Sequence, residues 1–294
     1  MPRRSNIIGT GLSGLVGSRI AELLGPRYAM TNLDLTTGVD ITNRLHVKKA
    51  MEQASGEVVV HLAAFTDVDA AHRQKGDKNG LCYTINVLGT RYVAQYCSTH
   101  SKYLIHISTD SVFSGEKKTP YTEEDSPRPI EWYGQTKLWA EHEVEKAGGK
   151  HAILRIAFPF RAHYPQKLDL VRTIYEKLKA GTLYPMFADQ LITPTFIDDI
   201  TKAIDVFIEK RPLGIYHIVG SSALSPYTLA KKIAKTFDLD GKKVKKGSLA
   251  KFLKTAKRPY QKRLALSNRK AKRELGITMS TIGKALRKME GQIE

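Results

Sequence analysis

The sequence predicts an α/β fold built on a doubly wound parallel sheet, followed by a smaller and partly discontinuous C-terminal lobe. Strand-like and helix-like segments alternate through the first 160 residues, which is the signature of βαβ units. A glycine-rich run directly follows the first strand-like segment, and the regular alternation ends near Ala157. These three observations favour a nucleotide-binding sheet with an added lobe.

The first half supplies the expected elements of the sheet in order. The run Val58-Val59-Val60-His61-Leu62 is continuously apolar around a single histidine, as in a central strand that is buried on both faces. The expected strands are residues 5–8, 28–33, 57–64, 103–108 and 152–156, and the expected helices are one that runs from the glycine loop through Ile20 and Leu24, and those at residues 80–97 and 132–146.

Beyond Ala157 we expect helices at residues 168–180, 199–209 and 226–237, with short apolar pieces at 191–195 and 214–219. The stretch from Gly241 onward is basic and has helical spacing. We therefore predict a dinucleotide-binding domain of residues 1–157 plus about 195–220, and a substrate-binding lobe of about 158–194 plus 221–294.

Composition indicates an ordinary globular protein. The chain of 294 residues is 41% hydrophobic and has no apolar run long enough to cross a bilayer, so no membrane association is expected. Its two cysteines, Cys82 and Cys97, match no metal-binding spacing, so we expect no metal site and no disulfide. Buried thiols in a cytoplasmic protein are the expectation.

Positive charge is concentrated at the C-terminal end. The net charge is +18, and residues 241–294 hold 17 Lys or Arg against 3 Glu, so this stretch alone carries +14. The charges are interrupted by apolar residues at spacings typical of folded helices with solvated outer faces, among them Leu264, Leu266, Leu275 and Leu286. No helix-turn-helix or aromatic stacking pattern is visible, so nucleic acid is not the expected partner.

The glycine-rich run fits a phosphate-binding loop. A strand precedes it and a helix follows, so the free amides of the helix would face a diphosphate that glycine allows to come close. The expected cofactor contacts here are Gly11, Ser13, Gly14, Leu15, Val16 and Gly17.

Asp34 lies 23 positions after Gly11, at the end of the second expected strand, where a carboxylate would accept hydrogen bonds from a ribose. Its neighbours Leu35, Thr36 and Thr37 offer no cation for a ribose phosphate, which favours NAD(H) and leaves NADP(H) open. An ordinary turn residue is the other interpretation of Asp34. Asp40 and Ile41 would border adenine, or form a helix N-cap.

Thr109, Tyr133 and Lys137 follow the glycine loop in an order that points to carbonyl chemistry. Tyr133 and Lys137 are four positions apart on one helix face, so the ammonium is expected to favour the ionised form of the phenol. Thr109 would add a second hydrogen-bond donor for a carbonyl oxygen that gains negative charge. Two further Y-x-x-x-K pairs, Tyr175/Lys179 and Tyr227/Lys231, have no such context and are interpreted as packing residues.

Widely spread strings resemble the extended short-chain dehydrogenase/reductase family, most closely its dTDP-4-dehydrorhamnose reductase branch. The supporting segments are residues 11–17, 61–69, 86–90, 108–115, 120–125 and 133–138, with Arg258-Pro259 near the end. The resemblance implies a Rossmann-type fold and reduction of the C4 ketone of a 4-keto-6-deoxy sugar carried on a nucleoside diphosphate. A homodimer is left open.

The resemblance also implies roles for individual residues. Thr109, Tyr133 and Lys137 become the catalytic triad, with Tyr133 as proton donor and Lys137 also on the nicotinamide ribose. Additional cofactor contacts would be Leu62, Ala63, Ala64 and Thr66, and the expected substrate contacts are Thr66, Val68, Thr109, Asp110, Ser111, Ala157, Phe158 and Arg258.

Two departures from the branch touch the sugar side. Ser111 stands where the branch usually has tyrosine, and Ile156-Ala157-Phe158 stands where it usually has Thr-Ser-Trp. A dehydratase would need a glutamate after Asp110, which Ser111 does not provide. An epimerase that retains NAD, and a binding subunit similar to the β subunit of methionine adenosyltransferase, remain alternatives.

Overall fold

The computed structural model describes residues 5–293 and divides the chain into two compact units. The first unit consists of Met1–Val112, Pro127–Arg155 and Thr201–Tyr216, and the second of Phe113–Ser126, Ile156–Ile200 and His217–Glu294. The chain thus passes between the units several times. In the described part of the chain, no helix is both long and apolar enough to span a membrane.

A six-stranded sheet in the order β2-β1-β3-β4-β5-β9 forms the centre of the first unit. Strand β1 pairs in parallel with β2 on one side and β3 on the other, and β3 pairs in parallel with β4. The strands are β1 (Asn6–Thr10), β2 (Ala29–Asn32), β3 (Val58–His61), β4 (Tyr103–Thr109), β5 (His151–Ile156) and β9 (Gly214–His217). The expected doubly wound fold is confirmed, and the strand order reverses between β1 and β3.

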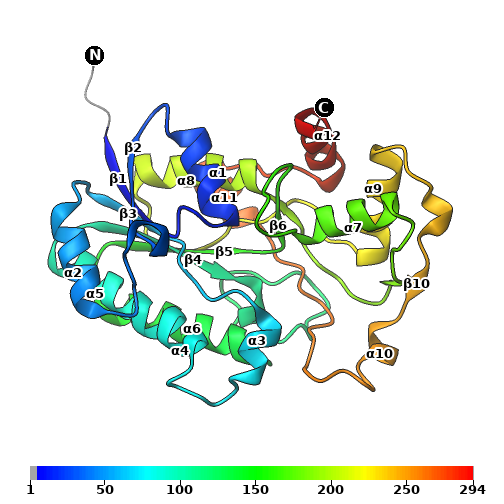
Figure 1. The fold of residues 1–294 in the computed structure, drawn as a ribbon, viewed down its shortest axis with the longest axis horizontal. Coiled ribbons are helices and arrows are strands. Elements are labelled where there is room, and N and C mark those ends of the chain that lie inside the picture. The colour runs from blue at the N-terminus through cyan, green and yellow to red at the C-terminus, as the bar shows by residue number, and fades with distance from the viewer. Residues whose placement is uncertain (1–4, 294) are drawn as a thin grey trace. The chain divides into compact units, whose positions relative to one another are not determined.

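Helices cover both faces of this sheet, with α5 and α6 on one face and α1 and α8 on the other (Figure 1). On the second face, the Tyr28 hydroxyl donates to Asp205 of α8 at 2.7 Å. The helical segments are α1 (Leu15–Leu24), η1 (Leu35–Thr37), α2 (Arg44–Gln53), α3 (Val68–Arg73), α4 (Leu81–Tyr83), η2 (Thr84–Gly89), α5 (Thr90–Thr99), η3 (Asp110–Val112), α6 (Trp132–Ala147) and α8 (Ile197–Lys210).

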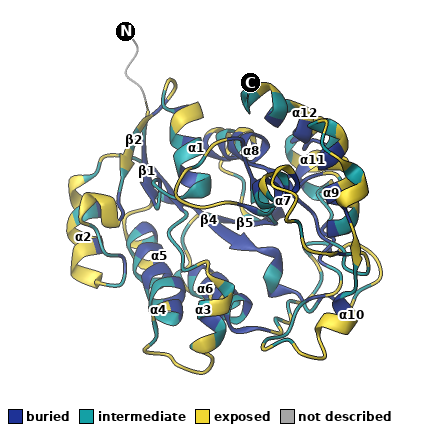
Figure 2. Cartoon of the chain, turned by 45° about the vertical axis from the view of Figure 1, so that its right-hand side comes forward, coloured by how far each residue is buried: buried dark blue, intermediate teal, exposed yellow. Residues whose placement is uncertain are grey.

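The core of the first unit follows from the apolar strands. Every residue of β3 and β4 is buried, so neither strand reaches solvent on either face (Figure 2). Ile8, Val59, Leu104 and Ile153 come from four different strands and pack together in one buried cluster. Burial of such side chains contributes roughly 2 kcal/mol each, which holds the strand ends in fixed positions.

The second unit is mainly helical around its own apolar core. Its elements are β6 (Pro159–Phe160), α7 (Leu170–Lys179), β7 (Met186–Phe187), β8 (Thr195–Phe196), α9 (Pro226–Thr236), η4 (Gly241–Lys243), β10 (Lys246–Gly247), α10 (Leu249–Phe252), α11 (Arg269–Leu275) and α12 (Ile282–Ile293). Ile174 of α7, Ile233 of α9 and Leu286 of α12 meet in this core. Strand pairs β6-β8 and β10-β7 border it.

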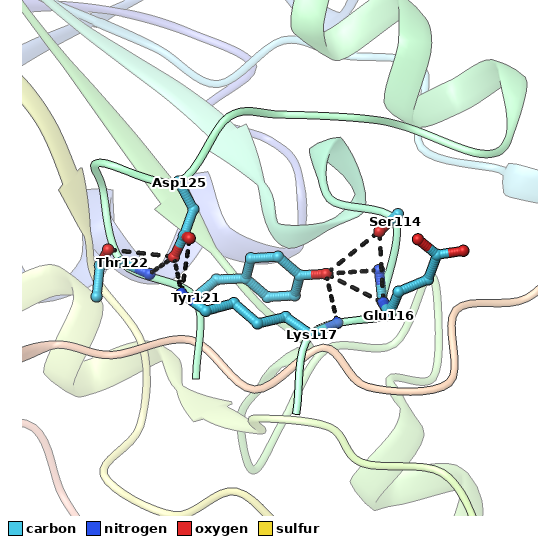
Figure 3. Close-up of polar contacts among 7 residues, drawn as sticks. Ser114, Glu116, Lys117, Tyr121, Thr122 and Asp125 are labelled. Carbon is cyan, nitrogen blue, oxygen red and sulfur yellow. Dashed lines mark hydrogen bonds and ion pairs between the residues drawn. The ribbon is translucent and has the colours of Figure 1, made fainter. Parts of the chain in front are cut away.

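Tyr121 organises residues 113–126 of the second unit (Figure 3). Its phenol oxygen accepts backbone N–H bonds from Gly115 at 3.0 Å, Glu116 at 3.1 Å and Lys117 at 3.2 Å. The Lys117 ammonium binds the carboxylate of Asp125, which also accepts the N–H of Thr122 at 2.7 Å. This segment is therefore a tightly bonded loop.

Most expected elements are confirmed, with differences at three places. The helix expected at residues 80–97 consists of α4, the π-helical η2 and α5 in succession. Helix α2 was not expected, because its sequence RLHVKKAMEQ buries only Val47 and Met51. Residues 113–126 group with the second unit, which the predicted boundaries did not separate, whereas the piece at 214–219 contributes β9 to the main sheet, in line with the predicted boundaries.

Candidate active site

The glycine loop after β1 has the geometry that a bound diphosphate needs. Gly11 has φ of 71°, and a Cβ on it would lie 2.7 Å from the Ala63 nitrogen. A Cβ on Gly17 would lie 2.3 Å from the Gly11 oxygen, so α1 can begin this close to the loop only with glycine there. Gly14 caps α1 without a side-chain hydrogen bond, which leaves the first-turn amides of Leu15 and Val16 for a ligand.

Asp34 joins the glycine loop to the end of β2. Its carboxylate accepts the Ser13 N–H at 3.0 Å, and the N–H and hydroxyl of Thr36 at 2.9 and 2.6 Å. Burial acts to raise the pKa of Asp34, but hydrogen bonds from Thr36, Asn32 and Ser13 outweigh it and lower the pKa to about 2. Asp34 is therefore ionised and caps η1, which bears out its interpretation as a turn residue, while its contact with a ribose stays a prediction.

Asp40 and Ile41 lie in the turn before α2. The Asp40 carboxylate accepts the N–H of Thr42 at 2.9 Å, and Asn43 is the residue that caps α2. The N-cap interpretation of Asp40 is therefore wrong. Ile41 is buried and belongs to the core of the first unit. A role for either residue beside adenine stays a prediction.

The loop after β3 lies directly against the glycine loop. Leu62 donates its N–H to the Thr10 carbonyl at 3.0 Å, and Ala63 donates to the Thr10 hydroxyl at 3.3 Å. Leu62, Ala63 and Ala64 are half-buried, Thr66 is exposed, and Val68 begins α3. The structure thus brings the predicted cofactor contacts of β1 and β3 together at the reversal of strand order, where open sheets bind ligands.

Thr109 and Tyr133 converge at the carboxyl end of β4. Thr109 is the last residue of this strand, and Tyr133 lies in the first turn of α6, where the Glu131 carboxylate accepts the N–H of Tyr133 at 2.8 Å. Burial raises the pKa of Tyr133, and a hydrogen bond with the Thr109 hydroxyl opposes this rise. The phenol is therefore protonated at neutral pH and shares a hydrogen bond with Thr109.

Lys137 lies one turn further along α6, but its ammonium is directed toward the backbone of β4. Its Nζ donates to the Ile107 carbonyl at 2.7 Å and lies 3.4 Å from His106 Nε2. Burial lowers the pKa of Lys137 to about 8, while Glu141 and Cys82 act to raise it. Burial dominates the pKa of Tyr133 and raises it, so the expected effect of the Lys137 ammonium on the phenol stays a prediction.

Asp110 and Ser111 extend the site beyond Thr109. The Thr109 hydroxyl donates to Asp110 Oδ1 at 3.1 Å and accepts the Ser111 N–H at 3.2 Å. Asp110 is 4% exposed, and its burial raises the pKa to about 7. Both residues therefore bond to a member of the predicted triad, and a carboxyl group that titrates near neutrality adjoins it.

The remaining predicted substrate contacts belong to the second unit. Ala157 is buried, Phe158 is half-buried and has a φ of 42°, and the Arg258 guanidinium stacks over the Tyr260 ring at 3.7 Å from its centroid. A positive φ in a bulky residue is rare and stores strain. Their roles toward a substrate stay predictions.

The other two Y-x-x-x-K pairs behave as expected of packing residues. Tyr175 and Tyr227 are partly buried against the core of the second unit. Lys179 lies over the Tyr175 ring at 5.9 Å, and Lys231 donates to the Gly241 carbonyl at 2.8 Å. Among the three pairs, the one at residue 133 adjoins a strand-end threonine.

Sequence reasoning missed two buried polar residues behind the site. Asn86 exchanges hydrogen bonds with both backbone groups of Phe65, at 2.8 and 3.2 Å, and donates to Thr136 at 3.0 Å. Glu141 binds Arg155 in a buried pair. An asparagine inside an apolar helical run, and a glutamate four positions after the lysine, are the signals that could have found them. No cluster of three or more potential metal ligands occurs within residues 5–293.

Known proteins resemble this chain over nearly its whole length. A family model described as the RmlD substrate binding domain matches residues 5–293. dTDP-4-dehydrorhamnose reductases are similar to the chain: that of Aggregatibacter actinomycetemcomitans is 30% identical, covering 97% of this chain and 98% of the relative, and that of Sinorhizobium fredii is 31% identical, covering 95% of each. The crystal structure of dTDP-4-dehydrorhamnose reductase from Bacillus anthracis in complex with NADP superposes with a TM-score of 0.90 at 27% identity, covering 99% of this chain and 100% of that one. The chain therefore belongs to the RmlD substrate binding domain family, within the extended short-chain dehydrogenases/reductases.

Proposed function

We propose that this protein is an NAD(P)H-dependent reductase of a dTDP-linked 4-keto-6-deoxy sugar, which accepts hydride at the C4 carbonyl. The convergence of Thr109 and Tyr133 at the end of β4 carries the proposal. Both lie in the first unit, together with Lys137 and the glycine loop. The names of the relatives support the same reaction class.

The residues of the first unit fit a dinucleotide. The glycines at positions 11 and 17 leave space that a Cβ would fill, and the first turn of α1 presents free amides to a diphosphate. Asp34 is ionised and would accept ribose hydroxyls with its remaining lone pairs. This supports NADH, while the neighbouring hydroxyls of Ser13 and Thr36 would tolerate a ribose phosphate.

The reduced nicotinamide supplies the hydride, and the protein supplies orientation and the proton. Tyr133, protonated at neutral pH, donates a hydrogen bond to the carbonyl oxygen and then transfers its proton as that oxygen becomes an alcohol. When substrate binds, the Thr109 hydroxyl would turn its one proton from Asp110 to the same oxygen, and this second hydrogen bond would limit the build-up of negative charge. Lys137 supplies a fixed positive charge and an N–H donor for the nicotinamide ribose.

On the sugar side we propose contacts from Asp110 and Ser111, and from Ala157, Phe158 and Arg258 of the second unit. Ser111 is smaller than the tyrosine usual in this branch, so the preferred ketosugar would be bulkier near that position or differently substituted. The first unit would thus serve as the dinucleotide-binding domain and the second as the substrate lobe. The buried free thiols of Cys82 and Cys97 support a cytoplasmic location.

The test mixes the purified protein with NADH or NADPH and a panel of dTDP-4-keto-6-deoxy sugars, and follows the loss of nicotinamide absorbance. Tyr133→Phe should lower kcat by roughly 10²-fold or more, while the affinity for NADPH stays within about twofold, because the ring is retained. Tyr227→Phe is the matched control, since that tyrosine also precedes a lysine by four positions. Equal loss of activity in both variants would refute the assignment of Tyr133.

A further inference from the structure

A row of buried polar side chains crosses the sheet of the first unit. Thr10 of β1, His61 of β3 and His106 of β4 are direct partners in the registers of these parallel strands, and all three are 1% exposed or less. Side chains at one register level point to the same face of a sheet. Bonds to residues of α5 and α6 identify this face as the one that these two helices cover (Figure 1).

His61 shows how a buried histidine in this row is satisfied. Its Nδ1 lies 2.6 Å from the Thr10 hydroxyl, and its Nε2 lies 2.9 Å from the hydroxyl of Thr90 on α5. Each hydroxyl can donate or accept, so either tautomer of the neutral ring is accommodated. The imidazole therefore has a partner on both nitrogens, as is usual for buried polar groups.

His106, in contrast, is bonded on one nitrogen only. Its Nε2 lies 3.4 Å from Lys137 Nζ, and its Nδ1 is buried without a hydrogen-bond partner among residues 5–293. Burial lowers the pKa of Lys137 only to about 8, so this amine is mostly an ammonium at pH 7. An ammonium can only donate, so Nε2 accepts from Lys137 and the ring proton must lie on the unpartnered Nδ1.

Packing alone does not account for a histidine at position 106. A buried donor without an acceptor is destabilising, and an apolar side chain would remove that penalty. Every residue of β4 is buried, so an apolar residue would suit the strand. The His61 ring, 5.3 Å away between centroids, offers a packing contact that an apolar side chain could also make. The bond with Lys137 is what requires the imidazole.

Two acceptors on β4 define where the Lys137 amine lies. The Ile107 carbonyl accepts one N–H at 2.7 Å, and His106 accepts a second. A single acceptor would hold the nitrogen at one distance but let it swing about that oxygen. The second acceptor fixes the place of Nζ, and with it the direction of the third N–H, which is left for a ligand.

We propose that His106 is a positioning residue, which accepts a hydrogen bond from Lys137 and thereby directs the third N–H of this ammonium toward the bound cofactor. His106 does not touch the cofactor or the reacting atoms, and it acts through Lys137. The contact of the third N–H with the nicotinamide ribose rests on the proposed function, whereas the bond between His106 and Lys137 does not.

The first experiment observes the imidazole of His106 in the full chain at pH 7, labelled with ¹⁵N-histidine, by long-range ¹H–¹⁵N correlation NMR. His106→Gln identifies the signals by their loss. The ring should carry its proton on Nδ1, and Lys137→Met should shift the Nε2 resonance because the donor is gone. Lys146→Met removes an exposed ammonium from the last turn of the same helix and should leave both nitrogen resonances unchanged.

The second experiment measures NADPH affinity by fluorescence titration in three variants. Glutamine carries its amide oxygen as many bonds from Cβ as Nε2 is, so His106→Gln keeps an acceptor for Lys137. Asparagine is one bond shorter and leucine is apolar, so neither can accept this bond. A hydrogen bond of this kind is worth about fivefold in affinity. His106→Asn and His106→Leu should bind NADPH about fivefold more weakly, and His106→Gln should stay within about twofold of the wild type.

Urea unfolding of the same variants separates positioning from packing. His106→Leu buries no unpaired polar group and should be the most stable of the three, although it binds NADPH more weakly than His106→Gln. NADPH affinity that follows stability across the three variants would overturn the proposal. A ring proton on Nε2, or an Nε2 resonance that does not respond to Lys137→Met, would overturn it as well. If no ketosugar were reduced while the NMR and NADPH results came out as expected, the proposed function would fail and this inference would stand.

Discussion

Asp110 gives the protein a measurable pH dependence of stability. Its side chain is 4% exposed, and within residues 5–293 its Oδ2 has no hydrogen-bond partner. The Thr109 hydroxyl donates to Oδ1 of this carboxyl, and this bond lowers the pKa less than burial raises it. We expect the Asp110→Asn variant, which keeps the shape and removes the titration, to isolate this effect.

The magnitude follows from the pKa of about 7 in the folded protein against 3.8 as the unperturbed value. Because the folded pKa is raised, the stabilising contribution is fully present below pH 3.8 and is lost as the pH rises through 7. Across the whole pH range, the contribution of Asp110 to the free energy of unfolding is about 4 kcal/mol, at 1.36 kcal/mol for each unit by which the two pKa values differ. Between pH 5.5 and 8.5 the loss is about 2 kcal/mol.

The assay is urea unfolding followed by tryptophan fluorescence at pH 5.5 and 8.5. Between these two pH values, the free energy of unfolding should fall by about 2 kcal/mol more in the wild type than in the Asp110→Asn variant. Asp77→Asn, at an exposed aspartate whose carboxylate accepts the Asn79 N–H at 2.8 Å, controls for the removal of one charge. Equal pH dependence in the wild type and Asp110→Asn would refute the reasoning about this carboxyl.

Three further variants test the cofactor loop and its support. Gly17→Ala places a Cβ 2.3 Å from a backbone oxygen, so NADPH affinity by fluorescence titration should fall at least about tenfold, with a stability loss of roughly 1–3 kcal/mol. Asp34→Ala should weaken the binding of NADH more than that of NADPH, and an unchanged ratio of the two affinities would argue against the ribose contact. In the wild type, the stability that Asp34 adds above pH 3.8 should disappear as the pH falls toward 2. Asn86→Ala leaves the backbone groups of Phe65 unpaired and should cost about 2 kcal/mol or more in urea unfolding, whereas an unaltered midpoint would contradict the bonding described.

Local sequence patterns were sufficient for strands β1 to β5 and for the order of the predicted site residues. The apolar run in β3 and the glycine loop after β1 depend on neighbours in sequence, so they can be recognised without coordinates. Helix α2 was not predicted, because it buries only Val47 and Met51 and its apolar residues therefore show only a weak helical repeat. The assignment of residues 113–126 to the second unit depends on Tyr121 pairing with Leu266, a contact between distant positions.

The relative positions of the predicted site residues followed from the sequence, but their electrostatics did not. Spacing placed Tyr133 and Lys137 on one helix face, as the structure has them. It could not reveal that the Ile107 carbonyl, a backbone group on another element, would bind the ammonium. Nor could it reveal the burial of Asp110, because desolvation is set by everything packed around a group and not by its neighbours in sequence.

The pairing of Asn86 with Phe65 restricts how this chain can vary in length. The Asn86 amide binds both the N–H and the C=O of one residue, so its two hydrogen bonds can form together only when that residue stands at a fixed distance along the chain from β3. Adding or deleting one residue between β3 and Phe65 would offer Asn86 the backbone groups of a different residue and shift Ala63 away from the first glycine. Natural or engineered relatives that keep this asparagine should therefore keep the number of residues in that loop, whatever their side chains.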